Sequence, residues 1–76
     1  MGQRTVAERV PADQVAAGDL LELWDGNRYR VTEVVPSASG KIIEIRTIVE
    51  LSVDPVLAVG RVQNMGRRAG TMMKRM

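Results

Sequence analysis

The chain has 76 residues, which is enough for one small domain. It contains no Cys and no His, so the sequence excludes a zinc site built on thiolate or imidazole ligands and nucleophilic catalysis of the Cys/His or Ser/His/Asp kind. The net charge is only +2, and no apolar run is long enough for a membrane helix. We therefore expect a cytoplasmic protein without disulfides, metal, cofactor or membrane partner.

The apolar residues make up 45% of the chain, but they include one Trp, one Tyr and no Phe. Val, Ile, Leu and Ala must fill the core, and β-branched residues favour strands. A domain of this size has a thin stability margin, and disulfides are not available to widen it. Self-association or docking on a partner are the routes that remain.

Residues 4–10 alternate in hydrophobicity and predict a first strand that ends at Pro11. Pro, Asp and a late Gly in residues 11–18 predict a single helical or 3₁₀ turn, with Val15 as a plug for one end of the core.

The sequence Asp25-Gly26-Asn27 lies between two runs typical of strands, residues 20–24 and 28–35. Asp-Gly in this setting predicts a hairpin turn. A strict alternation along the second run would bury Glu33 and expose Val34, so we expect a bulge or twist near Thr32-Glu33.

Residues 41–53 contain no Gly or Pro and predict an unusually long strand of about 43 Å, since a strand rises about 3.3 Å per residue. Its odd positions are apolar or Thr and are expected to face the core. Its even positions are polar except for Ile42 and Ile48, which must be covered by the C-terminal segment or by another copy of the protein. A final strand is predicted over residues 56–62, with Gly60 at a bend.

Five strands joined by short turns predict an all-β fold, and specifically a small five-stranded SH3-like barrel over residues 1–62. Residues 63–76 show no strand pattern and are expected to be a basic, Met-rich tail, either flexible or docked on a partner.

Charge is divided unevenly along the chain. Residues 1–60 hold six basic and nine acidic side chains, a net charge of −3, whereas residues 61–76 hold five basic and no acidic ones, a net charge of +5. The tail is either an arm that binds the phosphates of DNA or RNA, a frayed terminus, or a short amphipathic helix. The basic residues of this candidate nucleic-acid site are Arg61, Arg67, Arg68, Lys74 and Arg75.

Trp24 lies beside the hairpin turn, on the face opposite Leu21 and Leu23. It is either a stacking platform for a base or a Pro-rich peptide, or a cover for the open end of the barrel. With Ile42 and Ile48, it forms the candidate set of oligomer or partner contacts. The carboxylate pairs Glu44/Glu50 and Glu22/Glu33 lack the marks of a buried acid/base couple, so no catalytic residue is predicted.

Residues 18–48 resemble the SH3-like barrels of KOW type, in particular the N-terminal domain of translation elongation factor P. The resemblance lies in Gly18 before the apolar strand, the turn Gly26, Tyr29-Arg30-Val31, and Gly40-Lys41 before the long strand. The segment 12–19 is also similar to a turn found in small barrel proteins of actinobacteria and their phages. The loop before Lys41 departs from the elongation-factor pattern, so we carry over no modified lysine.

Together these features predict a non-enzymatic interaction module that self-associates and is of phage or mobile-element origin. The alternative is a nucleic-acid-binding barrel of KOW type that uses its basic tail.

Overall fold

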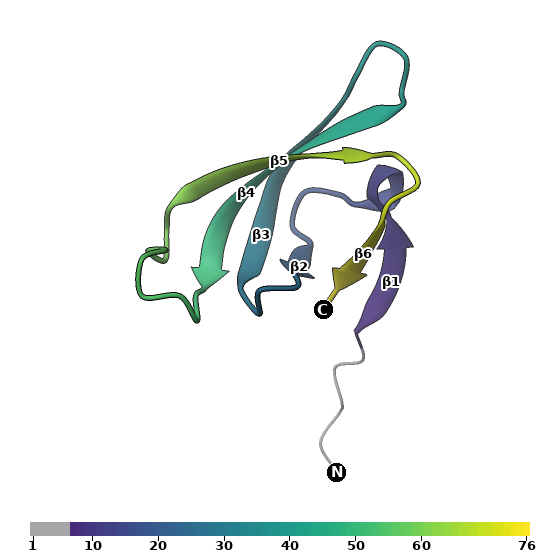
Figure 1. Ribbon diagram of the computed structural model, residues 1–76. Coiled ribbons are helices and arrows are strands. Elements are labelled where there is room, and N and C mark those ends of the chain that lie inside the picture. The colour runs from purple at the N-terminus through teal and green to yellow at the C-terminus, as the bar shows by residue number, and fades with distance from the viewer. Residues whose placement is uncertain (1–6) are drawn as a thin grey trace.

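The computed structural model describes residues 7–76, which form six antiparallel strands in one curved sheet and one short 3₁₀ turn (Figure 1). The elements are β1 (Glu8–Pro11), η1 (Ala12–Gln14), β2 (Leu20–Glu22), β3 (Arg28–Pro36), β4 (Ile42–Leu51), β5 (Val62–Arg68) and β6 (Met72–Arg75). The all-β prediction is confirmed. No helix in this part of the chain has the length and apolarity needed to span a membrane.

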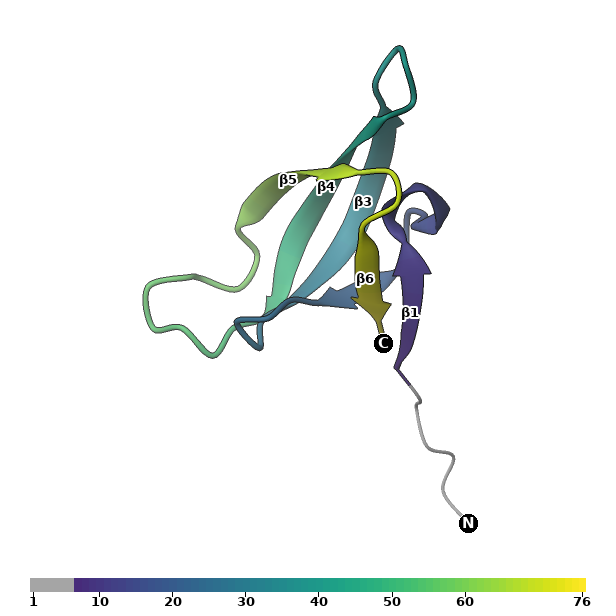
Figure 2. The ribbon, with the colours of Figure 1, turned by 45° about the vertical axis from the view of Figure 1, so that its right-hand side comes forward.

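The strand order is β1-β6-β2-β3-β4-β5. Strands β2 to β5 follow one another as hairpin neighbours, but the next strand, β6, lies between β1 and β2. Figures 1 and 2 show β5 passing over the sheet and turning down into β6 through a short corner at residues 69–71. The sheet is therefore strongly curved, but β1 and β5 remain its edges and it is open.

The core lies on the concave side of this sheet. Alternation places Ile43, Ile45, Thr47 and Val49 of β4 inward, as the sequence predicts, and the Thr47 hydroxyl donates to the Gln63 carbonyl at 2.6 Å. The inward face ends there, because Leu51 and Val53 are exposed. The buried apolar residues are Val10, Ala12, Val15, Leu21, Tyr29, Val31, Ile43, Ile45, Val49, Met65 and Met73.

Several local predictions are confirmed. The helical turn is η1, and Val15 is buried beside it. The turn between β2 and β3 has Gly26 at φ +83°, a value that favours glycine. The register of β3 against β4 shifts between Val31 and Glu33, where the bulge was expected. Of the first predicted strand, residues 4–6 lie outside the described residues.

The predicted strand 56–62 is wrong. Residues 52–61 form a loop with two turns, closed by hydrogen bonds from Leu57 N–H to the Asp54 carbonyl and from Arg61 N–H to the Ala58 carbonyl. Pro55 cannot donate to a strand ladder, and Gly60 has φ +89°.

The segment expected as a tail forms β5 and β6, so the sheet has six strands and not five. Each of these strands buries one methionine, Met65 and Met73, among the side chains of β4, β1 and β2.

Substitution of the two adjacent methionines of β6 tests whether this strand is packed in the core. Met73 is 4% exposed and Met72 is 50% exposed. Because Met73→Ala leaves a cavity in the core, it should lower the free energy of unfolding by about 2–4 kcal/mol, as measured by urea denaturation. Met72→Ala should stay within about 0.5 kcal/mol of the parent chain. Equal, small effects of both substitutions would contradict a β6 that is packed in the core.

Candidate binding surfaces

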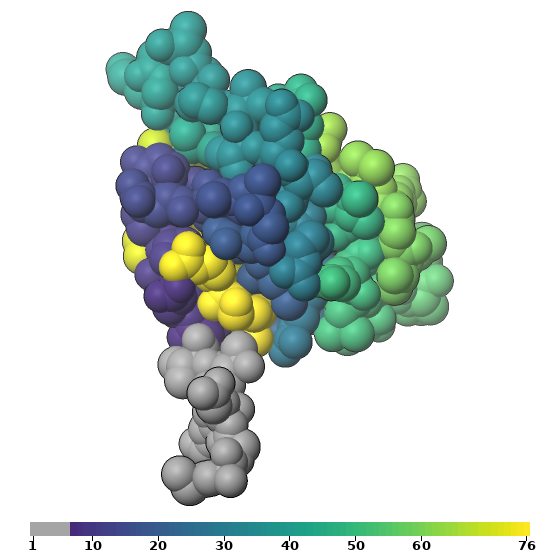
Figure 3. Space-filling view, turned by 180° about the vertical axis from the view of Figure 1, so that it is seen from behind, coloured from purple at the N-terminus to yellow at the C-terminus, as the bar shows by residue number. Residues whose placement is uncertain are grey.

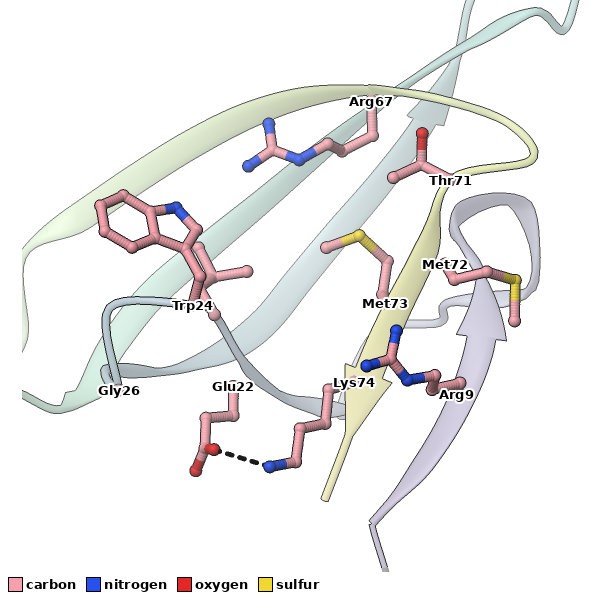
Figure 4. Close-up of a pocket in the computed structure, with 10 residues that line it drawn as sticks. Arg9, Glu22, Trp24, Gly26, Arg67, Thr71, Met72, Met73 and Lys74 are labelled. Atoms are coloured by element: carbon pink, nitrogen blue, oxygen red, sulfur yellow. Dashed lines mark hydrogen bonds and ion pairs between the residues drawn. The ribbon is translucent and has the colours of Figure 1, made fainter.

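The first candidate surface is a cleft of about 490 Å³ between β5, β6 and the turn after β2 (Figure 4). We call it the Trp24 cleft. Leu23 and Met73 give it an apolar floor, and Arg9, Arg67 and Lys74 give it positive charge. Its remaining lining residues are Glu22, Trp24, Gly26, Thr71 and Met72.

Trp24 is 95% exposed because of the turn that carries it. The Gly26 N–H donates to the Leu23 carbonyl at 2.9 Å, so residues 23–26 form a β-turn with Trp24 at its second position. Leu23 packs against the core and Trp24 points outward. The prediction that Trp24 covers an open end of the core is therefore wrong, whereas its availability for stacking fits the structure.

A buried polar network holds this turn in place. The Asn27 amide donates to Asp25 at 3.0 Å, and its oxygen accepts the Val53 N–H at 2.7 Å. The Tyr29 hydroxyl donates to the same Asp25 carboxylate at 3.1 Å. The network joins the β2–β3 turn to the loop after β4. Burial is the main cause that raises the pKa of Tyr29 above its ordinary value of 10.0, and the neighbouring Asp25 raises it further.

The charges of the Trp24 cleft are partly compensated. Glu22 accepts hydrogen bonds from Lys74 at 2.9 Å and from Arg28 at 3.0 Å, and these two partners, Lys74 first, lower the pKa of Glu22. Arg9 and Arg67 have no carboxylate within 4.0 Å among residues 7–76. The cleft therefore offers two uncompensated guanidinium groups beside an exposed indole.

A second, shallower hollow of about 610 Å³ lies across the corner at residues 69–71, and we call it the Lys41 hollow. Lys41 and Arg68 are adjacent there, because the Ala69 N–H donates to the Lys41 carbonyl at 2.9 Å and Ile42 pairs with Arg68. Its other lining residues are Ser39, Ile42, Ala69 and Gly70.

The structure distributes the five predicted basic residues and does not gather them in one arm. Arg61 is exposed in the loop before β5, Arg67 lines the Trp24 cleft, and Arg68 lines the Lys41 hollow. Lys74 is paired with Glu22. Arg75 binds Glu8 and, at 3.4 Å, Asp19; the Glu8 hydrogen bond is the main cause that raises the pKa of Arg75.

Two further cations, Arg9 and Lys41, line these hollows and were missed as site residues. Arg9 reaches the cleft because β1 pairs with β6, and Lys41 lies beside Arg68 because β4 pairs with β5. Neither pairing has a signal in the local sequence.

The second candidate surface is apolar and lies on the hairpin of β4 and β5. We call it the β4–β5 apolar surface, and its exposed side chains are Ile48, Leu51, Val53, Val56, Val59 and Val62. Ile48 is 38% exposed and pairs directly with Val62. The loop of residues 52–61, which carries much of this surface, extends from the sheet in Figures 1 and 2 and forms one flank of the molecule in Figure 3 (green).

The three predicted contact residues are not brought together. Ile42 is 46% exposed, but it lies six residues from Ile48 along β4, a distance of about 20 Å, and borders the Lys41 hollow. Trp24 lines the cleft on the other side of the corner. The β5 strand runs beside β4 but leaves Ile42 and Ile48 at least a third exposed.

The carboxylates considered for acid/base chemistry are engaged by cations. Arg46 binds both Glu33, at 3.0 Å, and Glu44, at 3.4 Å, whereas Arg30 binds Glu50 at 2.8 Å. Within residues 7–76, no three potential metal ligands of the His, Cys, Asp and Glu types are grouped as a metal site requires.

Comparisons of the chain with protein families, with curated proteins and with solved structures give no match.

The raised pKa of Tyr29 predicts a loss of stability in alkali. A group with a raised pKa in the folded state stabilises the fold fully below its unfolded pKa of 10.0, and this contribution is lost as the pH rises through the folded pKa. Tyr29 is the only Tyr in the chain, so absorbance at the tyrosinate wavelength reports it alone. We expect a midpoint above pH 10.0 in the native protein and a return to the ordinary value in urea. A native midpoint at or below that value would contradict a buried hydroxyl.

Proposed function

We propose that this protein is a non-enzymatic binding module that self-associates through the β4–β5 apolar surface. The observation that carries the proposal is the clustering of exposed apolar side chains. Nine large hydrophobic side chains are exposed among the described residues, and six of them lie between Ile48 and Val62. Exposed apolar side chains gathered in one stretch of a small domain are typical of interaction sites.

A second copy of the chain is the partner that fits this surface. Basic and acidic side chains both border this surface. They form ion pairs, Arg30 with Glu50 and, farther along β4, Arg46 with Glu33. A rim that carries both signs can complement itself across a two-fold axis, as an isologous interface requires. In addition, β5 is an edge strand, and the edge of a sheet can pair with another copy.

We further propose that the curved sheet is an SH3-like barrel in an open, six-stranded form, and that the similarity of residues 18–48 to KOW-type domains reflects this fold. The sharp passage from β5 into β6 supports the proposal, because it bends the sheet around one core.

Substitution of Ile48 tests the proposed interface. In Ile48→Lys, a charge replaces an apolar side chain where β4 pairs with Val62 of the same surface, and we expect the dimer dissociation constant to rise about 30-fold or more. Light scattering during size-exclusion chromatography would follow the mass from twice the chain mass toward 8.4 kDa.

Ile42→Lys is the matched control, because it makes the same change on the same strand and face but outside the β4–β5 apolar surface. Its association should equal that of the parent chain. A parent chain that stays at 8.4 kDa at high concentration would contradict self-association. Equal effects of both substitutions would place the interface elsewhere.

A further inference from the structure

The cations without ion pairs are concentrated around the corner at residues 69–71. Five cations pair with no carboxylate in the described part of the chain, and four of these line the two hollows: Arg9 and Arg67 in the Trp24 cleft, Lys41 and Arg68 in the Lys41 hollow. Glu22 is the one carboxylate that lines either hollow, and it is already bound to Lys74 and Arg28. The uncompensated positive charge therefore follows a path over the corner.

An aromatic platform lies at one end of this path. Trp24 is 95% exposed and borders the same cleft as the guanidinium of Arg67 (Figure 4). Exposed aromatic rings beside a positively charged groove bind single-stranded nucleic acid, because bases stack on the ring while the cations neutralise phosphates. The apolar floor formed by Leu23 and Met73 suits the edge of a stacked base.

We propose that a single-stranded nucleic acid binds along this path. One base stacks on Trp24, the adjoining phosphates lie at Arg9 and Arg67, and the strand continues over residues 69–71 toward Lys41 and Arg68. The inference does not depend on self-association, because the β4–β5 apolar surface shares no residue with either hollow.

Other ligands fit the same surface less well. A Pro-rich peptide requires a groove lined with several aromatic side chains, but Tyr29 is only 3% exposed and Trp24 is the one aromatic ring available. An acidic peptide would use the cations and leave the indole without a role.

Because the chain has a single Trp, its fluorescence measures nucleic-acid binding at Trp24 directly. Titration with the oligonucleotide dT10 at low salt should quench the emission of Trp24, because the base stacks on its ring. Trp24→Ala should weaken the binding of labelled dT10, measured by fluorescence anisotropy, about 5- to 100-fold. Because the side chain is exposed, this variant should keep the circular dichroism spectrum of the parent chain.

Two arginine variants distinguish binding at this site from nonspecific binding that depends on net charge alone. Arg67→Gln should lower the slope of log affinity against log salt by about 0.7, the effect of one phosphate contact in a single strand. Arg61→Gln is the matched control, since Arg61 also lacks an ion pair but lines neither hollow, and it should leave the slope unchanged.

Three results would overturn the proposal: no quenching by dT10, equal effects of the two arginine variants, or an abasic strand of the same length that binds as tightly as dT10. An oligoglutamate peptide that quenches Trp24 at the same concentration would assign the site to acidic peptides. The Ile48→Lys variant should bind dT10 with unchanged site affinity, so a failed interface and a failed nucleic-acid site give different results.

Discussion

The corner at residues 69–71 is the constraint on which the rest of the structure depends. It carries the chain from the edge strand β5 to β6, which is four strand positions away in the sheet. In a flat sheet that separation would be about 19 Å, but the steps from Arg68 to Met72 reach at most about 14 Å. The sheet must therefore curve. Hydrogen bonds fix the corner from both sides, since the Ala12 N–H donates to the Thr71 carbonyl at 2.8 Å and the Ala69 N–H to the Lys41 carbonyl at 2.9 Å.

The same curvature produces the core and the candidate sites. It brings Met65 of β5 and Met73 of β6 over the inward residues of β4 and gives a small, aromatic-poor chain a two-sided core. It also leaves a cleft where β5 passes over the turn after β2, and a hollow where β5 leaves β4. Arg67 and Arg68 are consecutive in β5 and point to its opposite faces, so one enters each hollow.

Local chemistry predicts the parts of this fold that are built from neighbours in sequence. The Asp25-Gly26-Asn27 turn, the bulge at Thr32-Glu33 and the inward face of β4 all follow from residues within one hairpin. The strands β5 and β6 do not, because their strand character comes from pairing with β4, β1 and β2 and not from β-branched residues. Residues 56–62 give a wrong prediction for the opposite reason: valine is typical of strands, but Pro55 and Gly60 lie in two turns there. Among the site residues, Trp24 and Ile48 can be predicted from the sequence. Arg9 and Arg67 line the same cleft only because the sheet folds, so the sequence does not predict their proximity.

The two candidate surfaces lie at opposite ends of β5, and this arrangement connects the two proposals. Val62, at the start of the strand, belongs to the β4–β5 apolar surface. Arg67 and Arg68, about 17 to 20 Å farther along, belong to the hollows. The two surfaces share no lining residue, although Val53 of the apolar surface lies beside Gly26 of the Trp24 cleft. A dimer formed through the Val62 end would present two strand-binding paths on one particle. Two linked sites raise overall affinity by about 10²–10⁴ for a ligand long enough to reach both, without any new contact. Self-association would then raise the affinity for a long nucleic acid by linking two sites. A short oligonucleotide such as a decamer reaches only one site, so its affinity would not change.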